Sequence, residues 1–159
     1  MGGSALFLSH MLDLAGAPAS ALVIAIDIEL HPSALALTHP RIRLIEGDST
    51  ADSTVTQVEN LLINIPSTNG GMVSLDSDHS TRHVLKELDV YPRFVGTGNY
   101  LVVEDTTVNG RPVLLEHGPG PGEALDDWLP RHPEFERDDA LWQRQQFSAH
   151  AGGWLRRIN

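Results

Sequence analysis

The stretch LVVEDTTVNG, residues 101–110, joins a run of strand formers to a run of turn formers. Its first three residues are apolar, and two of them are β-branched, which favours an extended strand. Glu104 and Asp105 follow directly, and an Asn-Gly pair then marks a turn. The stretch therefore predicts a buried strand that ends in two adjacent carboxylates.

Segments with helical and strand periodicity alternate along the rest of the chain, which is typical of an α/β fold. We expect one α/β domain over residues 1–159, with a mostly parallel sheet and a C-terminal antiparallel pair. The long loop 106–122 contains His117, which we consider for contact with a substrate. The predicted elements are helix 3–16, strands 21–27 and 41–48, helix 52–63, strand 71–78, helix 81–95, strand 99–105, helix 122–132, and the pair 135–141 with 147–158.

Composition excludes several functional classes. The 11 basic and 21 acidic residues give a net charge of -10, which argues against nucleic-acid binding. The chain has no cysteine, so disulfides, thiolate zinc sites and cysteine nucleophiles are excluded. No apolar run is long enough for a membrane span, and the first residues lack the basic region of a secretory signal. We expect a cytoplasmic protein with a small-molecule partner.

Carboxylates stand at the ends of three predicted strands. They are Asp27, Asp76 and the pair Glu104-Asp105. Ligands of open α/β sheets bind beyond the carboxyl ends of the strands, so these acids should line one crevice. Carboxylates brought that close need compensation by a cation. All-oxygen ligation favours Mg2+, with Mn2+ and Ca2+ as alternatives.

Two residues that follow Asp76 are candidates for a catalytic base. Asp78 and His79 lie in the sequence LDSDHS, where either side chain can reach the crevice. His79 is alternatively a fourth metal ligand. Asp78 and Ser80 are also typical caps for the helix that follows.

Other residues in the first half of the chain suggest an adenosine-containing cofactor. An acid in the position of Asp27 accepts hydrogen bonds from ribose hydroxyls, and Asp48 could meet an adenine edge. Glycines at the start of the first helix allow close approach of a ligand carboxylate. The predicted cofactor-binding residues are Gly2, Gly3, Ser4, Asp27, Asp48, Ser49 and Asp76.

The motifs GGSALFL, IDI, LIEGDST, LDSDHS, YLVVEDT, GPGPGEAL and GGWLRR together resemble the cephalosporin hydroxylase family. That family is similar to sugar O-methyltransferases that act on macrolide and aminocoumarin antibiotics, and to rhamnosyl O-methyltransferases. The resemblance implies a Rossmann-like, three-layer class I methyltransferase fold that uses S-adenosylmethionine (SAM). It also implies Mg2+ held by Asp76, Glu104 and Asp105, a base at His79 or Asp78, and a sugar hydroxyl of an antibiotic or glycolipid as acceptor.

The chain departs from this family pattern at its start. A first, central strand normally precedes the GGS motif, and this chain begins at Met1-Gly2-Gly3. We therefore expect an N-terminally truncated family member with a gap in the sheet, which makes a homo-oligomer a reasonable expectation. An iron oxygenase is not supported, because an iron(II) triad needs two histidines and a carboxylate, and the only His-x-acid spacing, His132-Pro133-Glu134, lies in a predicted turn.

Two other functional classes stay open. A metal-dependent phosphoester hydrolase would use a similar acidic site, but the sequence has no phosphate-binding glycine loop and only the lone Lys86 nearby. A non-catalytic remnant would keep the fold as a binding or oligomerisation module. Titration with SAM and Mg2+ separates the three, since a methyltransferase binds both, the hydrolase binds metal alone, and the remnant binds neither.

Overall fold

The computed structural model describes residues 2–65, 70–144 and 146–159. The chain divides into two compact units, Met1–Ser67 and Thr68–Asn159. Each unit has a sheet of its own, with two strands in the first unit and four in the second. Within the described residues, no helix is long and apolar enough to cross a membrane.

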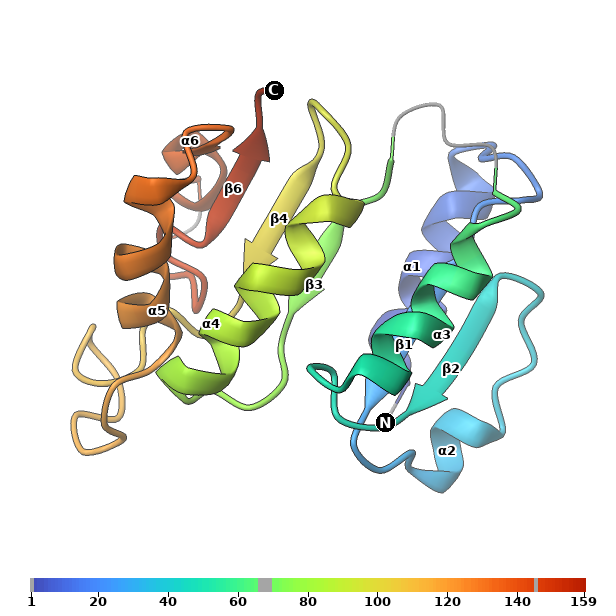
Figure 1. Ribbon diagram of the computed structural model, residues 1–159, viewed down its shortest axis with the longest axis horizontal. Helices are drawn as coiled ribbons and strands as arrows, with labels where there is room; N and C mark the ends of the chain where they lie inside the picture. Colours follow the sequence, from blue (N-terminus) through green and yellow to red (C-terminus); the bar gives the residue numbers. More distant parts are fainter. Residues whose placement is uncertain (1, 66–69, 145) are drawn as a thin grey trace. The chain divides into compact units, whose positions relative to one another are not determined.

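The first unit places helices on both faces of a parallel strand pair. Figure 1 shows α3 in front of the two strands and α1 behind them. The register pairs Asp27 with Glu46, so both strands end in acids at the same edge. The short helix α2 was not predicted; it begins with Pro32 and is capped by His31, whose Nδ1 accepts the Ser33 N–H. The elements are α1 (Gly3–Leu14), β1 (Val23–Asp27), α2 (Pro32–Leu35), β2 (Ile42–Glu46) and α3 (Asp52–Leu62).

A buried arginine holds the loop between α1 and β1. Arg41 is 8% exposed, and its guanidinium donates to the backbone carbonyls of Ala17, Pro18 and Ala21 at 2.6–3.0 Å. Its Nε donates to Asp13 Oδ1 at 2.6 Å. The planar group thereby satisfies four acceptors at once, which a lysine could not do.

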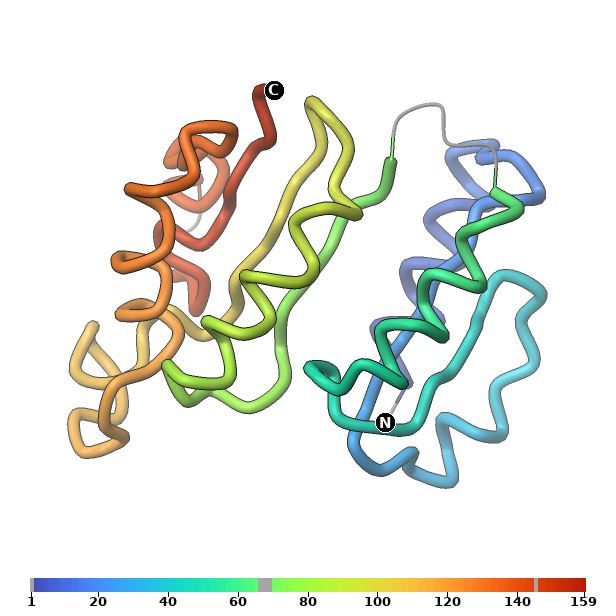
Figure 2. Tube along the Cα trace, in the orientation of Figure 1, coloured from blue at the N-terminus to red at the C-terminus, as the bar shows by residue number. Residues whose placement is uncertain are grey.

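The second unit contains a four-stranded sheet in the order β3-β4-β6-β5. β3 and β4 pair in parallel, whereas β6 is antiparallel to both β4 and β5. Figure 2 shows the C-terminal segment running alongside β4. The elements are β3 (Val73–Leu75), α4 (Thr81–Val90), the 3-10 helix η1 (Tyr91–Phe94), β4 (Tyr100–Val103), α5 (Pro121–Trp128), the 3-10 helix η2 (Leu129–Arg131), β5 (Phe135–Arg137), α6 (Asp139–Trp142) and β6 (Trp154–Arg157).

The core of the second unit lies between its sheet and two helices. α4 and α5 pack side by side over one face of the sheet (Figure 1). Leu88 and Trp128 from these helices are 0% and 1% exposed, and Leu101 and Leu155 from the sheet are both 0% exposed. This burial fixes the position of β4, and therefore the position of Glu104, which directly follows β4.

Most predicted elements are confirmed, but several differ in type or length. The predicted terminal pair 135–141 with 147–158 is strand only over Phe135–Arg137 and Trp154–Arg157, and Asp139–Trp142 forms the helix α6 instead. The second unit's sheet has one parallel and two antiparallel pairings, so it is mixed rather than mostly parallel. The predicted helix 81–95 ends at Val90, because Pro92 lacks the N–H that an α-helix needs, and the chain continues as η1. The predicted strand 71–78 is ordered as a strand only over Val73–Leu75.

Candidate metal and catalytic site

Two acidic strand ends lie side by side in the second unit. β3 and β4 are parallel neighbours with Leu75 opposite Val103. The Glu104 N–H donates to the Leu75 carbonyl at 3.0 Å and continues the ladder by one bond. Asp76 and the Glu104-Asp105 pair therefore leave the sheet at one edge, which confirms the predicted adjacency.

Asp76, His79 and Asp105 form a group that could hold a metal ion. Their ligand atoms all lie within 4.8 Å of one another. His79 Nε2 lies 3.3 Å from Asp76 Oδ1 and 3.4 Å from Asp105 Oδ2. The side chains of Asp76, Asp105 and His79 are 58%, 34% and 28% exposed, so the group is open to a ligand from solvent.

Glu104 follows β4 beside this group, but its carboxylate contacts Ser74 and His150 rather than His79. Its Oε1 accepts a hydrogen bond from Ser74 Oγ at 2.5 Å. Its Oε2 lies 3.5 Å from His150 Nε2. The three acids predicted to bind metal therefore share one sheet edge, and two of them converge on His79.

The Asp78 side chain stabilises the turn that leads into α4. The Ser80 N–H donates to Asp78 Oδ1 at 2.7 Å, and Ser80 in turn caps α4. This backbone hydrogen bond, with a second from the Ser80 side chain, lowers the pKa of Asp78 below its ordinary value. A carboxylate with a lowered pKa is a weaker base, so His79 is the better candidate of the two.

A hydrogen bond from the loop after β3 to α4 anchors the segment that carries His79. Ser77 Oγ donates to the carboxylate of Glu87 at 2.7 Å, and Glu87 is 2% exposed on the buried face of α4. The buried carboxylate thus ties residue 77 to a helix that is itself packed on the sheet. The loop from Asp76 to Ser80 is held at both ends.

His150 is a site residue that the sequence did not reveal. Its Nδ1 accepts the Asp105 N–H at 3.2 Å, across 45 residues of sequence. It lies between α6 and β6, in a segment predicted only as part of a terminal strand pair. No motif marks it, because only the insertion of β6 beside β4 brings it to the site.

The predicted cofactor-binding acids of the first unit lie at strand ends. Asp27 ends β1 and is exposed, and its Oδ1 accepts the Glu29 N–H at 3.3 Å. Asp48 Oδ1 accepts both the N–H and the hydroxyl of Thr50 at 2.8 Å. Ser49 beside it is half-buried. Asp76, the remaining predicted acid, belongs to the second unit.

Packing requires a glycine at position 2 but not at position 3. Gly2 has φ +79°, and an added Cβ would lie 2.8 Å from Leu37 and 3.0 Å from Ala34, so packing within the first unit already requires glycine. An added Cβ at Gly3 would meet nothing within 4 Å. Gly3 and Ser4, in the first turn of α1, are exposed.

The loop from Thr106 to Gly120 ends next to the His79 segment. Thr81 donates from its N–H to Pro119 O at 3.1 Å and from its hydroxyl to Gly120 O at 2.8 Å. His117, which we considered for substrate contact, is exposed on this loop, with Nδ1 3.4 Å from Gly118 O. His117 therefore lies on a loop whose end contacts the segment that carries His79.

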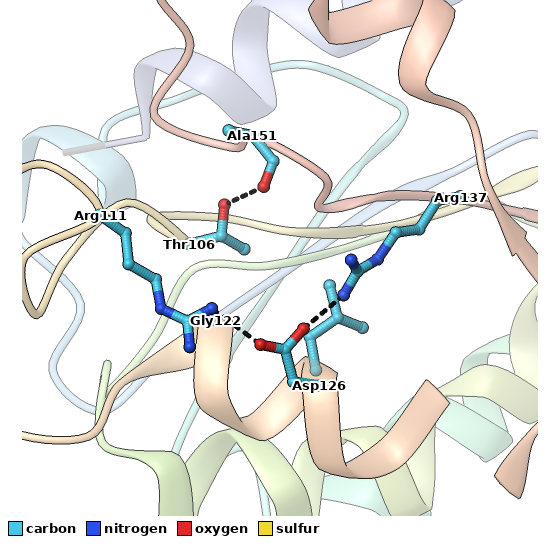
Figure 3. Close-up of a pocket in the computed structure, with 7 residues that line it drawn as sticks. Thr106, Arg111, Gly122, Asp126, Arg137 and Ala151 are labelled. Carbon is cyan, nitrogen blue, oxygen red and sulfur yellow. Dashed lines mark hydrogen bonds and ion pairs between the residues drawn. The ribbon is translucent and has the colours of Figure 1, made fainter. Parts of the chain in front are cut away.

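A small cavity of about 130 Å³ lies at the base of this loop (Figure 3). Two arginines face it, and Asp126 binds both, Arg111 at 2.8 Å and Arg137 at 2.7 Å. Burial raises the pKa of Asp126, but the two hydrogen bonds outweigh burial and leave that pKa below its ordinary value. Glu123 also pairs with Arg111 at 3.1 Å, so the positive charges are compensated and the network serves to fasten the loop.

Two histidines and a carboxylate also meet in the first unit. His10, Asp13 and His39 have ligand atoms within 4.8 Å of one another. The sequence did not predict this group, because His39 lies 26 residues from Asp13, although His10 and Asp13 share one turn of α1. The Arg41 guanidinium already compensates Asp13, and its hydrogen bond lowers the pKa of that carboxyl. We therefore regard this group as a structural ion pair.

Comparison with known proteins gives a family match over almost the whole chain. The family described as rhamnosyl O-methyltransferase/CmcI matches residues 1–158. A rhamnosyl O-methyltransferase from Mycobacterium leprae is 36% identical over 156 residues, which cover 97% of this chain and 66% of that protein. One from Mycobacterium tuberculosis is 35% identical over 141 residues, which cover 87% of this chain and 56% of that protein. The chain thus spans 56% to 66% of the length of these curated relatives.

Solved structures of the methyltransferase MycE from the mycinamycin biosynthetic pathway are also similar. A complex with Mg and SAH is 16% identical, with a TM-score of 0.49, and the match covers 87% of this chain and 38% of that one. A complex with Mg, SAH and mycinamycin VI is 20% identical, with a TM-score of 0.45, and covers 67% of this chain and 28% of that one.

Proposed function

The chain belongs to the rhamnosyl O-methyltransferase/CmcI family, and on this premise we propose that it takes part in Mg2+-dependent transfer of a methyl group from SAM to a sugar hydroxyl. The observation that carries the proposal is the convergence of Asp76 and Asp105 on His79, with distances of 3.3 and 3.4 Å. The names of the curated relatives support a rhamnosyl acceptor.

The donor chemistry of the site fits a hard divalent cation. Two carboxylates already converge within 4.8 Å, and Glu104 supplies a third at the same sheet edge. Mg2+ prefers carboxylate oxygens and keeps several waters, which suits an open site. We assign Asp76, Glu104 and Asp105 as its ligands. His79 offers nitrogen, a poorer ligand for Mg2+, so we assign it the role of base.

The charge of a bound cation would lower the pKa of the acceptor hydroxyl and orient it. His79 in its neutral form then takes the hydroxyl proton on a ring nitrogen and passes it to solvent. The hydroxyl oxygen forms a bond to the methyl carbon as the carbon–sulfur bond of the sulfonium breaks. The products are a methyl ether and neutral S-adenosylhomocysteine.

In the first unit, we propose that Asp27 binds the ribose hydroxyls of SAM and that Asp48 and Ser49 lie at the adenine. Gly2, Gly3 and Ser4 would receive the methionine carboxylate at the start of α1. The first turn of α1 has no side-chain cap, and Gly3 and Ser4 are exposed, which supports this assignment.

Calorimetric titration of the full chain with SAM and with Mg2+ tests the proposal. A methyltransferase binds both ligands; binding of metal alone would favour the phosphoester hydrolase, and binding of neither would favour a non-catalytic remnant. Replacement of Asp76 by Ala should abolish Mg2+ binding and metal-dependent turnover while leaving SAM affinity nearly unchanged.

A pair of variants tests the base. His79→Gln should reduce methyl transfer to a rhamnoside about 10²- to 10⁴-fold, because a positioned base contributes about that much. His83→Gln is the matched control, because His83 lies on α4 outside the carboxylate group, with its Nε2 3.7 Å from Glu87 Oε1. This variant reports effects that act only through the anchor of the loop. Equal activity of His79→Gln and the wild type would exclude His79 as the base.

A further inference from the structure

Hydrogen bonds fasten the segment from Ser148 to Gly153 to the residues on either side of the Glu104-Asp105 pair. The Val103 N–H donates to the Gly153 carbonyl at 2.9 Å. Further along, the Thr106 hydroxyl donates to the Ala151 carbonyl at 2.9 Å (Figure 3). These bonds bracket Glu104 and Asp105. A third bond, from the Thr107 N–H to the Ala149 carbonyl at 3.3 Å, places His150 within the fastened segment.

His150 contacts both acids with different ring nitrogens. Nδ1 accepts the Asp105 N–H at 3.2 Å, and Nε2 lies 3.5 Å from Glu104 Oε2. A backbone N–H can only donate, so Nδ1 must present its lone pair. The neutral ring therefore carries its proton on Nε2, on the side of the Glu104 carboxylate.

Asp105 has a backbone conformation that makes its N–H partner important. Its φ is +51°, in the left-handed region that residues other than glycine rarely adopt. The parallel ladder between β3 and β4 ends with the Glu104 N–H, so Asp105 cannot pair its own N–H in the sheet. The His150 ring accepts that N–H and holds the turn that directs Asp105 toward His79.

We propose that His150 is a positioning residue that sets the directions of the Glu104 and Asp105 carboxylates through its two ring nitrogens. The inference rests on the proposed function in one respect only, namely that the ligand of the two carboxylates is a divalent cation. Outer partners of metal ligands typically change metal affinity by about 10- to 100-fold when they are removed. His150 acts here through two ligands rather than one.

The first test is the Mn2+ or Mg2+ affinity of full-length variants, measured by calorimetry. His150→Ala should weaken binding about 10- to 100-fold. His150→Asn places an oxygen near the position of Nδ1 and should recover part of the loss through Asp105. Ser148→Ala is the matched control, because it removes a hydrogen bond to the His150 N–H at 3.1 Å but leaves the ring in place.

Equal weakening by Ser148→Ala and His150→Ala would overturn the proposal, because loop anchoring and not the ring would then be responsible. Unchanged affinity in His150→Ala would overturn it as well. Urea denaturation of each variant, followed by tryptophan fluorescence, establishes that the second unit is folded.

Nitrogen NMR of the metal-free chain tests the same contacts without a ligand. We expect His150 to show an unprotonated Nδ1 and a protonated Nε2, and the Asp105 amide signal to shift strongly in His150→Ala. A protonated Nδ1 or an unmoved Asp105 amide would overturn the inference. Failure of the proposed function is distinct, because the wild type would then bind no Mg2+ while the NMR result stood.

Discussion

Replacement of Gly153 by Ala should destabilise the second unit by an amount that the structure allows us to work out. A Cβ at this position would lie 2.1 Å from the Val103 carbonyl oxygen, which belongs to a buried strand. Relief of this clash requires movement of backbone, because the nearest atom is a backbone carbonyl oxygen. Overpacking in a core costs about 1–3 kcal/mol. Loss of the Val103–Gly153 hydrogen bond adds about 1 kcal/mol, for a total of about 2–4 kcal/mol.

Urea denaturation followed by tryptophan fluorescence measures this loss. All 3 tryptophans, Trp128, Trp142 and Trp154, lie in the second unit, so the signal reports on that unit alone. With a slope of about 2 kcal/mol per molar urea, the midpoint should fall by about 1–2 M. Gly71→Ala is the control in the same unit, since a Cβ there would meet only the Phe94 carbonyl oxygen at 3.4 Å, an ordinary contact distance. A Gly153→Ala midpoint equal to that of the wild type would refute the close approach of segment 148–153 to β4.

Three further changes have defined outcomes. Arg41→Met should destabilise the first unit by about 2–4 kcal/mol, since several buried hydrogen bonds to a charged group are lost, and amides of β1 and β2 should then exchange faster with solvent; unchanged exchange would contradict this role. The folded-state pKa of Asp126 is lowered, so its stabilisation is present above the ordinary pKa and is lost as pH falls through the folded value; the free energy of unfolding should fall below about pH 4, and less steeply in Asp126→Asn. A slope equal to the wild type would count against the arginine pairing. Ser80→Ala should cost about 0.5–2 kcal/mol as a lost helix cap, visible in the same fluorescence assay, and no loss would contradict capping.

The acidic strand ends could be predicted because their signals are local. An apolar run followed by Asp76 or by Glu104 identifies both the strand and its end. Parallel pairing of the two strands then follows from the alternation of helices and strands between them. The adjacency of Asp76 and Asp105 needed no information beyond this order.

The remaining parts of the site depend on contacts between distant segments. β6 enters the sheet between β4 and β5, and this insertion brings His150 to Asp105. Periodicity within a segment does not indicate its neighbours, so the sequence predicted β6 but not its place beside β4. The choice between Asp78 and His79 likewise required the turn geometry that commits Asp78 to Ser80.

Anomalous diffraction from crystals of the full chain soaked in Mn2+ tests the central claim most directly. Manganese is a close substitute for Mg2+ at oxygen sites and is located by its own signal. The account predicts one strong peak at the carboxyl ends of β3 and β4, coordinated by Asp76, Glu104 and Asp105 with His79 beside it. A peak elsewhere, or none at this edge, would contradict a metal-dependent site built on these three acids.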